Sequence, residues 1–331
     1  MRQVLALAAL ALGTVQAQAT GALTIRFLDV GQGDAVRITS PEGKSILYDG
    51  GRSEARMQAL LKQYGVQSLE LIAASHGDAD HITGLFPAVQ LFKPRFFLNN
   101  GIAPTSQTWS KLTSAVQKAG TQGLRARDQV INLGSVRMTV LPPPPGMPEE
   151  QNVNSVGLLI QYGTFRVLLT GDSETPETQA WLKKYPASVL GNIDVYKSIH
   201  HGANNGDHLA WLNVVRPKNV VIGVGPNNYG HPTQEALSLY RRVRATVYRT
   251  DRQGTLTVVV QPGGKFTIAS EKGTPVPANQ GAAPSPAPSS PVSPMYWSCT
   301  QARAAGVTPL RRGQPGYSPS LDRDGDGIAC E

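Results

Sequence analysis

Short apolar runs alternate with amphipathic stretches between about residues 22 and 268. The runs are rich in β-branched residues and are bounded by Gly, Pro, Asn or Asp, which is typical of strands. They predict strands at Leu23–Val30, Ala35–Thr39, Ser45–Tyr48, Leu69–Ala74, Arg95–Leu98, Val136–Leu141, Ser155–Tyr162, Arg166–Leu169, Val195–Ile199, Asn219–Val224, Thr246–Arg249 and Thr255–Val260.

Helical spacing of the remaining apolar residues predicts helices at Ser53–Tyr64, Thr108–Lys118, Glu174–Lys184, Asp207–Val215 and Thr233–Val243. Pro232 and Thr233 form a typical helix start, whereas Ser53 offers only a partial cap. Many strands with helices between them indicate a layered α/β fold. Two sheets lying between helices are one such arrangement.

The N-terminus has the pattern of a secretory signal peptide over residues 1–19. Arg2 supplies the positive charge, Val4–Leu12 the apolar segment and Ala17–Ala19 the cleavage site. An uncleaved anchor is the alternative. No later segment predicts a membrane span. We therefore expect the mature chain, from residue 20 on, to be secreted, periplasmic or held at the cell envelope.

Composition divides the rest of the chain. Residues 271–294 are dominated by Pro, Ala, Ser and Gly, which predicts an extended linker between a domain at 20–270 and a compact tail at 295–331. Both cysteines, Cys299 and Cys330, lie in the tail. In an exported protein this suggests a disulfide, with two unpaired thiols as the alternative.

Four candidate metal ligands lie directly after one predicted strand. His76, Asp78, Asp80 and His81 follow Leu69–Ala74. Open α/β sheets place their sites at the carboxyl ends of strands. Two imidazoles and two carboxylates suit a divalent cation such as Zn²⁺ or Mn²⁺. The alternative is a solvated polar turn.

Three more predicted strands end in side chains of the same kind. Asp172, the pair His200 and His201, and His231 each follow a strand. Taken singly, Asp172 could be a helix cap and the histidine pair a polar turn. Taken together with the first motif, they predict one shared site.

The order of these motifs resembles the metallo-β-lactamase fold. More specifically, the chain resembles the hydrolase domain of ComEC-type DNA-uptake proteins in the segments Phe27–Asp34, Leu47–Gly51, Asn154–Val156, Lys197–Gly202 and Gly230–Pro232. The resemblance covers roughly residues 22–268. It implies an α/β (α+β) fold, an αββα sandwich with a binuclear metal site between the edges of the sheets.

The resemblance also implies roles for individual residues. Two ions of Zn²⁺ or Mn²⁺ would be held by His76, Asp78, Asp80, His81, Asp172 and one of His200 and His201. In that arrangement Asp172 bridges the ions and Asp80 orients the attacking hydroxide. Asp49 is implied to fix a ligand histidine from behind.

Two positions depart from the wider fold family. Asp78 stands where many members have His, and no His lies between His81 and Asp172, where Asn154 and Ser155 come nearest. The site at His76 and Asp78 is therefore expected to be rich in oxygen ligands and weaker for Zn²⁺, which suits Mn²⁺.

Two further polar residues have open roles. His231 is either a ligand of the substrate phosphate or a proton donor to the leaving oxygen. Lys197 either steadies a phosphate or is a surface lysine. The loop Gly31–Asp34 either brings its backbone close to the site or is a tight turn between strands.

The tail carries carboxylates at alternate positions, followed by Gly327. This matches the first half of an EF-hand loop, in which Ile328 offers its carbonyl. The tail resembles the excalibur calcium-binding domain, which implies Ca²⁺ bound by Asp322, Asp324, Asp326 and Glu331 and a Cys299–Cys330 disulfide.

The leading hypothesis is an exported metal-dependent hydrolase, a phosphodiesterase or DNA nuclease. The alternatives are a hydrolase of lactams, lactones or small phosphoesters, and a non-catalytic metal-binding envelope protein. The net charge of +8 is compatible with nucleic acid. A basic cluster, Arg241, Arg242, Arg244 and Arg249, either contacts phosphates or forms a solvated helix face. Aromatic residues are sparse, so no base-stacking platform is expected, and the oligomeric state is not indicated.

Overall fold

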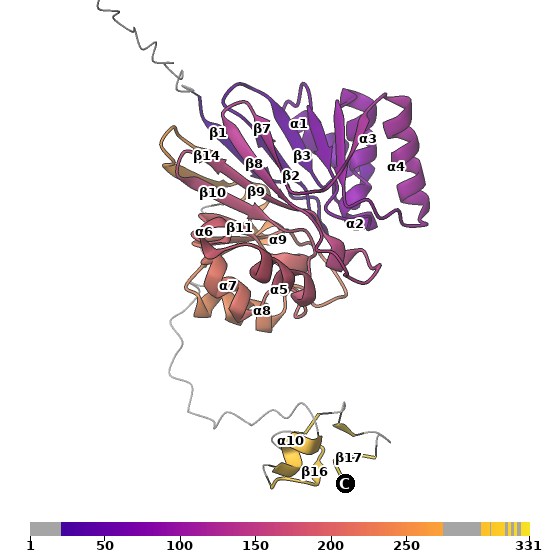
Figure 1. The fold of residues 1–331 in the computed structure, drawn as a ribbon, viewed down its shortest axis with the longest axis vertical. Helices are drawn as coiled ribbons and strands as arrows, with labels where there is room; N and C mark the ends of the chain where they lie inside the picture. Colours follow the sequence, from indigo (N-terminus) through magenta and orange to yellow (C-terminus); the bar gives the residue numbers. More distant parts are fainter. Residues whose placement is uncertain (1–20, 274–298, 305, 315–316, 319–320, 323–325) are drawn as a thin grey trace, which may run out of the picture. The chain divides into compact units, whose positions relative to one another are not determined.

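The computed structural model describes residues 21–273, 299–304, 306–314, 317–318, 321–322 and 326–331. These residues form two compact units, one on each side of the stretch 274–298 (Figure 1). The predicted signal peptide, residues 1–19, lies outside the described residues. So do Asp324 and the predicted linker from residue 274 onward.

The first unit is built on two sheets. One has eight strands in the order β15 (Phe266–Ser270), β14 (Leu256–Val260), β1 (Leu23–Phe27), β2 (Val36–Thr39), β3 (Ser45–Tyr48), β4 (Leu71–Ala73), β5 (Phe96–Asn99) and β6 (Gln122–Arg125). The other has seven in the order β13 (Thr246–Arg249), β12 (Asn219–Ile222), β11 (Val195–Lys197), β10 (Phe165–Leu169), β9 (Gly157–Tyr162), β8 (Val136–Leu141) and β7 (Gln129–Leu133).

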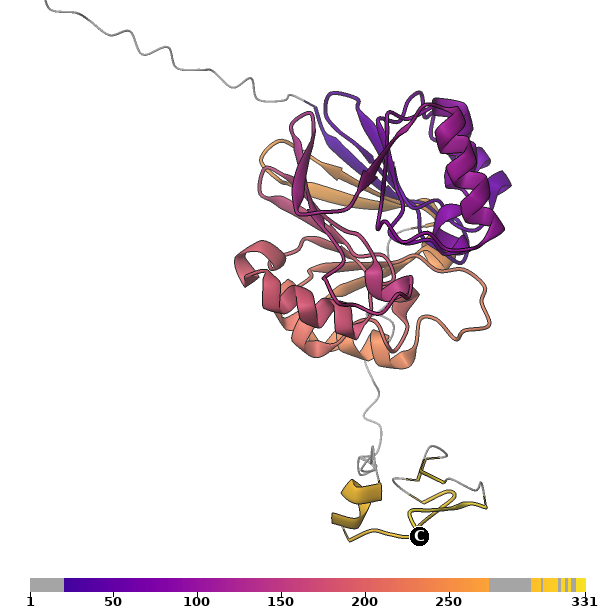
Figure 2. The same cartoon turned by 45° about the vertical axis from the view of Figure 1, so that its right-hand side comes forward.

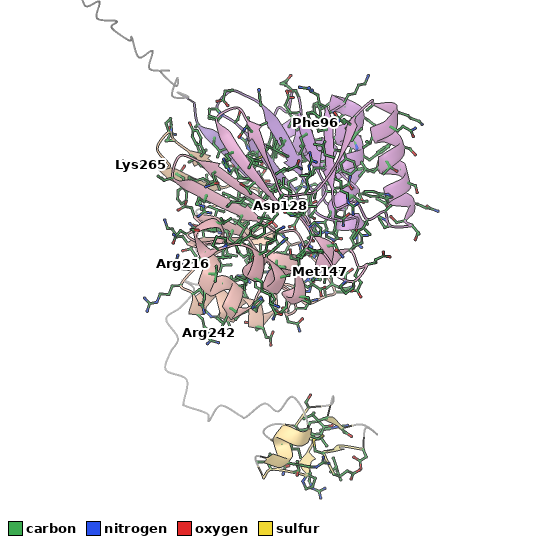
Figure 3. The ribbon with its side chains drawn as sticks, viewed as in Figure 1. Phe96, Asp128, Met147, Arg216, Arg242 and Lys265 are labelled. Carbon is green, nitrogen blue, oxygen red and sulfur yellow. A yellow bond between two sulfur atoms is a disulfide. The ribbon has the colours of Figure 1, made fainter. Side chains whose placement is uncertain are left out.

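Side chains that point alternately to the two faces of each sheet let the sheet pack on both faces. In β3, Ile46 belongs to the core between the two sheets, whereas its neighbour Leu47 packs beneath helices. Successive side chains point to opposite faces of a sheet, so a strand buried on both faces is continuously apolar. Figure 3 shows side chains filling the space between the layers.

Helices cover the outer face of each sheet (Figures 1 and 2). The first sheet is covered by α1 (Glu54–Gln63), α3 (Leu85–Phe92) and α4 (Gln107–Lys118), and the second by α5 (Thr175–Lys184), α7 (Leu209–Val215) and α8 (Gln234–Arg242). Shorter helices are α2 (Ala79–Ile82), η1 (Asn152–Asn154), α6 (Ala187–Leu190), η2 (Ile199–Gly202) and α9 (Thr250–Gln253). The predicted αββα sandwich is confirmed.

The predicted helix starts are seen as caps. The Thr233 hydroxyl accepts a hydrogen bond from the Ala236 N–H, and the Ser53 hydroxyl accepts one from the Arg56 N–H, so Ser53 is a full cap. Arg241 and Arg242 are exposed in the last turn of α8, and Arg242 points out of the domain (Figure 3). Such exposure is compatible with both a solvated helix face and phosphate contacts.

Parallel strands bring the motifs together. β3, β4 and β5 run parallel in one sheet, and β10 to β13 run parallel in the other. The carboxyl ends of neighbouring parallel strands lie at one edge of a sheet. The residues that follow β3, β4, β10, β11 and β12 therefore share one region.

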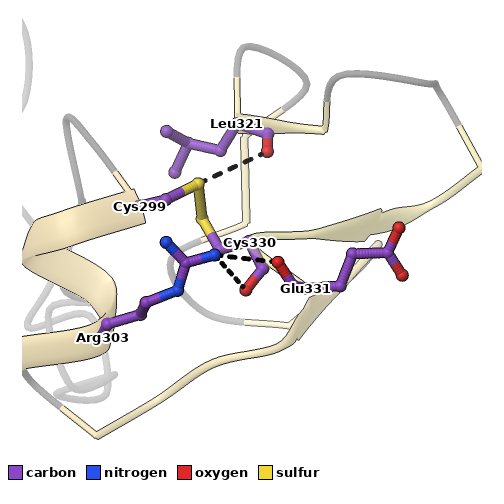
Figure 4. Close-up of a disulfide and its surroundings, with 5 residues drawn as sticks. All are labelled: Cys299, Arg303, Leu321, Cys330 and Glu331. Atoms are coloured by element: carbon purple, nitrogen blue, oxygen red, sulfur yellow. Dashed lines mark hydrogen bonds between the residues drawn. A yellow bond between two sulfur atoms is a disulfide. The ribbon is translucent and has the colours of Figure 1, made fainter.

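The second unit is small. It contains α10 (Cys299–Ala304), β16 (Leu310–Arg311) and β17 (Ile328–Ala329), with the buried residues Ala302, Leu310 and Ala329 as its core. The predicted Cys299–Cys330 disulfide is confirmed. Arg303 donates hydrogen bonds to the carbonyls of Cys330 and Glu331 beside it (Figure 4).

None of the helices in the described segments has the length and apolar character that a membrane crossing requires.

Candidate metal centre

Side chains from both sheets converge on the carboxylate of Asp172, directly after β10. The Nε2 atom of His81 lies 3.1 Å from Asp172 Oδ2, and that of His201 lies 3.2 Å from the same oxygen. Asp80 Oδ2 lies 3.6 Å from His201 Nε2. The sequence-predicted residues Asp80, His81, Asp172 and His201 are therefore neighbours in space.

The imidazole rings are fixed from behind through their Nδ1 atoms. His81 Nδ1 lies 3.0 Å from Asp49 Oδ2, and His201 Nδ1 lies 2.7 Å from the Gly223 carbonyl. Ser75 Oγ donates to Asp49 and can accept from His76 Nδ1 at 3.0 Å. These contacts assign the proton of each neutral ring to Nδ1 and leave Nε2 with a lone pair.

A divalent cation fits this arrangement. The Nε2 atoms of His76, His81 and His201 are buried and lack a hydrogen-bond partner within the described residues. Ligand atoms of Asp34, His81, Asp172 and His201 all lie within 4.8 Å of one another. Buried polar atoms without partners are costly, and a nitrogen and oxygen donor set suits Zn²⁺ or Mn²⁺.

Asp34 is the member of this cluster that the sequence reasoning did not assign. It is buried in the loop between β1 and β2, where its N–H donates to the Asp80 carbonyl at 3.3 Å. The preceding Gly33 has φ +131°, and a Cβ there would lie 2.3 Å from the Asp80 carbonyl oxygen. The loop thus brings its backbone against the site. In the sequence, the glycine that directly precedes Asp34 was the feature that could have indicated Asp34 as a residue of the site.

Lys197 is buried, and the surface-lysine alternative is wrong. Its side chain is 1% exposed; it forms an ion pair with Asp34 and donates to the Gly171 carbonyl at 3.1 Å. Its Nζ also lies 3.6 Å from Asp172 Oδ1. The ammonium group is a fixed positive charge behind the carboxylates, so it has no free reach toward a phosphate at the mouth.

The charges in this cluster are strongly coupled. Burial would raise the pKa of Asp172, but His201, His81 and Lys197 outweigh it and lower that pKa well below its usual value. Burial would lower the pKa of His81, yet Asp172 and Asp49 raise it well above its usual value. The carboxylates therefore stay ionised and attract cations, and protons on the rings compete with a metal ion.

His76 and Asp78 form a second, more open group. Asp78 Oδ2 lies 3.5 Å from His76 Nε2, and the Asp78 side chain is 48% exposed. This pair lies next to the buried cluster because the rings of His76 and His81 are 4.2 Å apart. It offers fewer ligands than the buried cluster.

Asn154 and Ser155 have different surroundings. The Asn154 amide donates to the carbonyls of Pro148 and Glu150, so it orders its own loop. The Ser155 hydroxyl accepts from the Asp172 N–H at 3.2 Å, while the Ser155 N–H donates to the buried Glu177. Ser155 therefore positions Asp172, and Asn154 does not reach the site.

His200 and His231 face the opening of the site. His200 Nε2 lies 3.8 Å from Asp172 Oδ2, farther than His201. The ring centroid of His231 is 5.6 Å from that of His200 and 6.4 Å from that of His201. Burial, with His200 and His201 nearby, lowers the pKa of His231, so its ring is neutral near pH 7.

The backbone of the histidine pair is left-handed, with φ 49° at His200 and 53° at His201. Such conformations cost free energy in residues other than Gly and persist where the surroundings hold them. Asp207 supplies a brace, because its buried carboxylate accepts hydrogen bonds from the Ile199 N–H, the Tyr240 hydroxyl and the Tyr196 hydroxyl.

In the second unit, two of the calcium candidates lie among the described residues and accept hydrogen bonds from backbone N–H groups. The Asp322 carboxylate accepts from the Gly327 N–H at 2.9 Å, and the Asp326 carboxylate accepts from the Ile328 N–H at 2.7 Å. The candidate donors there, with Glu331, are all oxygen atoms, which fits Ca²⁺.

Family models match both units. That of the metallo-beta-lactamase superfamily matches residues 28–225, and that of the Excalibur calcium-binding domain matches residues 296–331. The solved metallo-beta-lactamase fold protein YhfI from Bacillus subtilis is 16% identical with a TM-score of 0.44, covering 75% of this chain and 100% of that chain.

Two curated relatives are similar over the first unit. ComE operon protein 3 of Bacillus subtilis (strain 168) is 26% identical over 255 residues, covering 70% of this chain and 32% of that protein. Recombination protein 2 of Haemophilus influenzae is 30% identical over 239 residues, covering 70% of this chain and 28% of that protein. The chain thus spans about a third of the length of these relatives. With its two sheets, its motif order and a family match over more than half of its length, the chain belongs to the metallo-beta-lactamase superfamily and carries an Excalibur calcium-binding domain.

Proposed function

We propose that this protein is a metal-dependent phosphodiesterase that cleaves DNA with water as the nucleophile. The observation that carries the proposal is the convergence of two buried imidazole Nε2 atoms, from His81 and His201, on the carboxylate of Asp172. Each ring is held through its other nitrogen, so both Nε2 atoms face Asp172, and a divalent ion bound there would replace the protons on them.

The residues that would hold metal fall into two groups. His81, His201 and Asp172 would hold one divalent ion, with Asp34 and Asp80 as nearby carboxylates. His76 and Asp78 would hold a second, more weakly, and share Asp172 with the first. Divalent ions bound there would supply Lewis-acid polarisation of a phosphoryl oxygen and activation of water at neutral pH.

Other residues would handle the water and the leaving group. Burial would raise the pKa of Asp80, but His201 and His81 outweigh it and lower that pKa, so Asp80 is an ionised acceptor that can orient an attacking water. His231 lies at the mouth, where it can bind a phosphate oxygen. The negative charge of a bound phosphate would raise the pKa of its ring, which favours proton donation to the leaving oxygen.

The choice of DNA rests on two observations. The matched relatives are named for the ComE operon and for recombination, and this chain carries a net charge of +8, which favours a polyanionic partner.

The relatives and the Excalibur domain also favour an extracytoplasmic protein, with a signal peptide at 1–19, a hydrolase domain at 20–270, a linker at 271–294 and a calcium-binding tail at 295–331 that associates with the envelope.

The test is cleavage of labelled single- and double-stranded oligonucleotides by the full-length protein, with Mn²⁺ or Zn²⁺. We expect metal-dependent cleavage that is lost in Asp80→Asn and Asp172→Asn and kept in Asp194→Asn. Asp194 is a matched control because it is also buried but precedes β11, whereas the site follows that strand.

Two outcomes would contradict the proposal. A metal-loaded protein that leaves DNA intact but hydrolyses a lactone or lactam would be a different hydrolase. A protein that binds no divalent metal and hydrolyses nothing would be a binding module. Sequencing the N-terminus of the exported protein tests cleavage after residue 19.

A further inference from the structure

We propose that a hollow beside the metal centre binds one unpaired nucleotide, whose base stacks on Tyr229 and whose phosphate contacts Arg52. The inference rests on the proposed nuclease function for the identity of the ligand and adds the form of substrate that the site accepts. It concerns the loop Gly225–His231, which follows β12, and Arg52, which follows β3.

Tyr229 is an exposed ring that is linked to the candidate ligand His201 through the ring of His231. It is 61% exposed, more than any other large hydrophobic residue in the described part of the chain. Its ring stacks on His231 with centroids 5.6 Å apart and an interplanar angle of 29°. His231 in turn stacks on His201 at 6.4 Å and 28°. The series of rings, each tilted by less than 30° to the next, leads from the buried His201 to the surface, with Tyr229 as its outer member.

The loop holds Tyr229 in a fixed position. Asn227 Oδ1 accepts hydrogen bonds from the N–H groups of Tyr229 and His231, at 3.0 and 3.1 Å. Its Nδ2 donates to the carbonyls of Gly225 and His231. On the other side, a Cβ at Gly225 would lie 2.5 Å from the Gln32 nitrogen, so the loop is packed backbone to backbone. An aromatic ring held in this way costs little entropy when it binds a flat partner.

The hollow in front of this loop has the chemistry of a nucleotide site. Its volume is about 640 Å³, and it is lined by Gln32, Arg52, Pro226, Asn227, Asn228 and Tyr229. Arg52 is exposed and has no ion-pair partner among the residues that the structure describes. An aromatic face, amide side chains and an unpaired guanidinium suit a base with its phosphate.

The stacking requirement selects single strands. In a duplex both faces of a base are already stacked, whereas an unpaired base can be splayed onto an aromatic side chain. Sparse aromatic residues gave no reason to expect such a platform, yet one ring in the right place is enough. The composition of the chain does not show this, because the exposure of Tyr229 and its contact with His231 depend on the fold.

The test measures binding to the full-length protein in Ca²⁺ without added transition metal, so that affinity is read apart from cleavage. Fluorescence anisotropy compares labelled oligo(dT), an abasic strand of equal length and a duplex. Tyr229→Ala is expected to weaken oligo(dT) binding about tenfold and to leave the abasic strand unchanged. Tyr229→Phe should keep the wild-type affinity, and Arg52→Gln should weaken both single strands and lower the salt dependence.

A fluorescent reporter gives a second readout. In Tyr229→Trp, the added indole should be quenched by oligo(dT) and not by the abasic strand. Leu91→Trp is the matched control, since Leu91 is 58% exposed on α3 and does not line the hollow. Quenching at both positions or at neither, or equal affinity of the wild type for base-bearing and abasic strands, would overturn the proposal.

Failure of this inference can be told from failure of the proposed function. If wild-type protein cleaves DNA with Mn²⁺ but Tyr229→Ala binds oligo(dT) like the wild type, the subsite is refuted and the nuclease stands. If base-dependent binding is found but no phosphodiester is cleaved with Mn²⁺ or Zn²⁺, the nuclease is refuted and the subsite stands.

Discussion

The carboxylate of Asp49 holds the ring of His81, with Asp49 Oδ2 at 3.0 Å from His81 Nδ1. The same carboxylate accepts hydrogen bonds from the N–H and hydroxyl of Ser75, at 2.7 and 2.8 Å. Asp49 is fully buried, so these contacts are made without competition from water. They fix the orientation of His81 and leave its Nε2 facing Asp172.

Asp49→Asn is therefore expected to weaken divalent metal binding about 10- to 100-fold, as loss of such outer contacts commonly does. The measurement is competition with a chromophoric chelator, using protein stripped of metal. Asp194→Asn should bind metal like the wild type. Equal affinity of Asp49→Asn and wild type would show that the contact does not support a ligand.

Substitutions of His201 and of His231 should affect metal binding and catalytic turnover differently. His201→Ala is expected to lose bound metal, because His201 Nε2 lies 3.2 Å from Asp172. His231→Asn should retain the metal and lower kcat by about 10²- to 10⁴-fold, the usual contribution of a group that transfers a proton. Elemental analysis beside kinetics on one preparation decides this. Metal loss in His231→Asn would instead make His231 a ligand.

The buried Asp34–Lys197 pair should be strongly coupled in stability. Removing Asp34 leaves Lys197 with only the more distant Asp172, and removing Lys197 takes the ammonium partner from Asp34. Loss of one member of a buried ion pair costs about 3–5 kcal/mol. Asp34→Asn and Lys197→Met are each expected to lower the free energy of unfolding by that order, measured with urea on metal-free protein. The double variant should be less destabilised than the sum of the two. Additive effects would show that the two charges are independent.

The free energy of unfolding should depend on pH through the titration of Asp207. Burial raises its pKa from 3.8 to about 6, although hydrogen bonds from Tyr240 and Tyr196 oppose the shift. The folded state therefore binds this proton more tightly than the unfolded state, so stability from this group falls as pH rises from about 4 to 6.

The stabilisation that Asp207 contributes should fall by roughly 3 kcal/mol over this pH range, since each pKa unit corresponds to about 1.4 kcal/mol. Asp207→Asn lacks this titration, and the difference in unfolding free energy between wild type and variant should shrink as pH rises through that window. Urea titrations at several pH values measure it. A difference that is constant with pH would contradict the assignment.

The calcium-binding tail should unfold independently of the first unit. Chelating Ca²⁺ and reducing the Cys299–Cys330 disulfide should make residues 295–331 sensitive to protease while the first unit keeps its melting temperature. The disulfide alone is worth about 3–4 kcal/mol for the loop it closes. Asp324→Ala with Asp326→Ala should mimic chelation, and Asp128→Ala should not. A tail that stays protected in that pair of variants would refute calcium binding there.

The sequence predicts the site best where a candidate metal ligand directly follows a strand. Asp172 and the pair His200 and His201 directly follow short strand-like runs, Phe165–Leu169 and Val195–Ile199, so the pattern places them at the ends of strands. Asp34 follows a loop of glycines, and its closeness to His81 arises from the approach of that loop to Asp80. The burial of Lys197 could not be predicted because it depends on Asp34 as partner.

The unpredicted elements have weak or ambiguous patterns. Helix α3 has the sequence Leu-Phe-Pro-Ala-Val-Gln-Leu-Phe, which is apolar on most sides and lacks clear helical periodicity. Strands β6, β7 and β15 lie at the ends of their sheets and carry many half-exposed or exposed residues. Tertiary pairing, more than local preference, makes such segments strands.

Strand β1 pairs along its whole length with β14, Leu23 opposite Val260 and Phe27 opposite Leu256. During synthesis β1 leaves the ribosome first and waits for its partner until nearly the whole hydrolase unit has been made. Pairings so distant in sequence form slowly, and an open strand edge invites wrong partners. The first sheet is therefore completed only after residues 256–260 have been made, which places its closure late in the folding of the first unit.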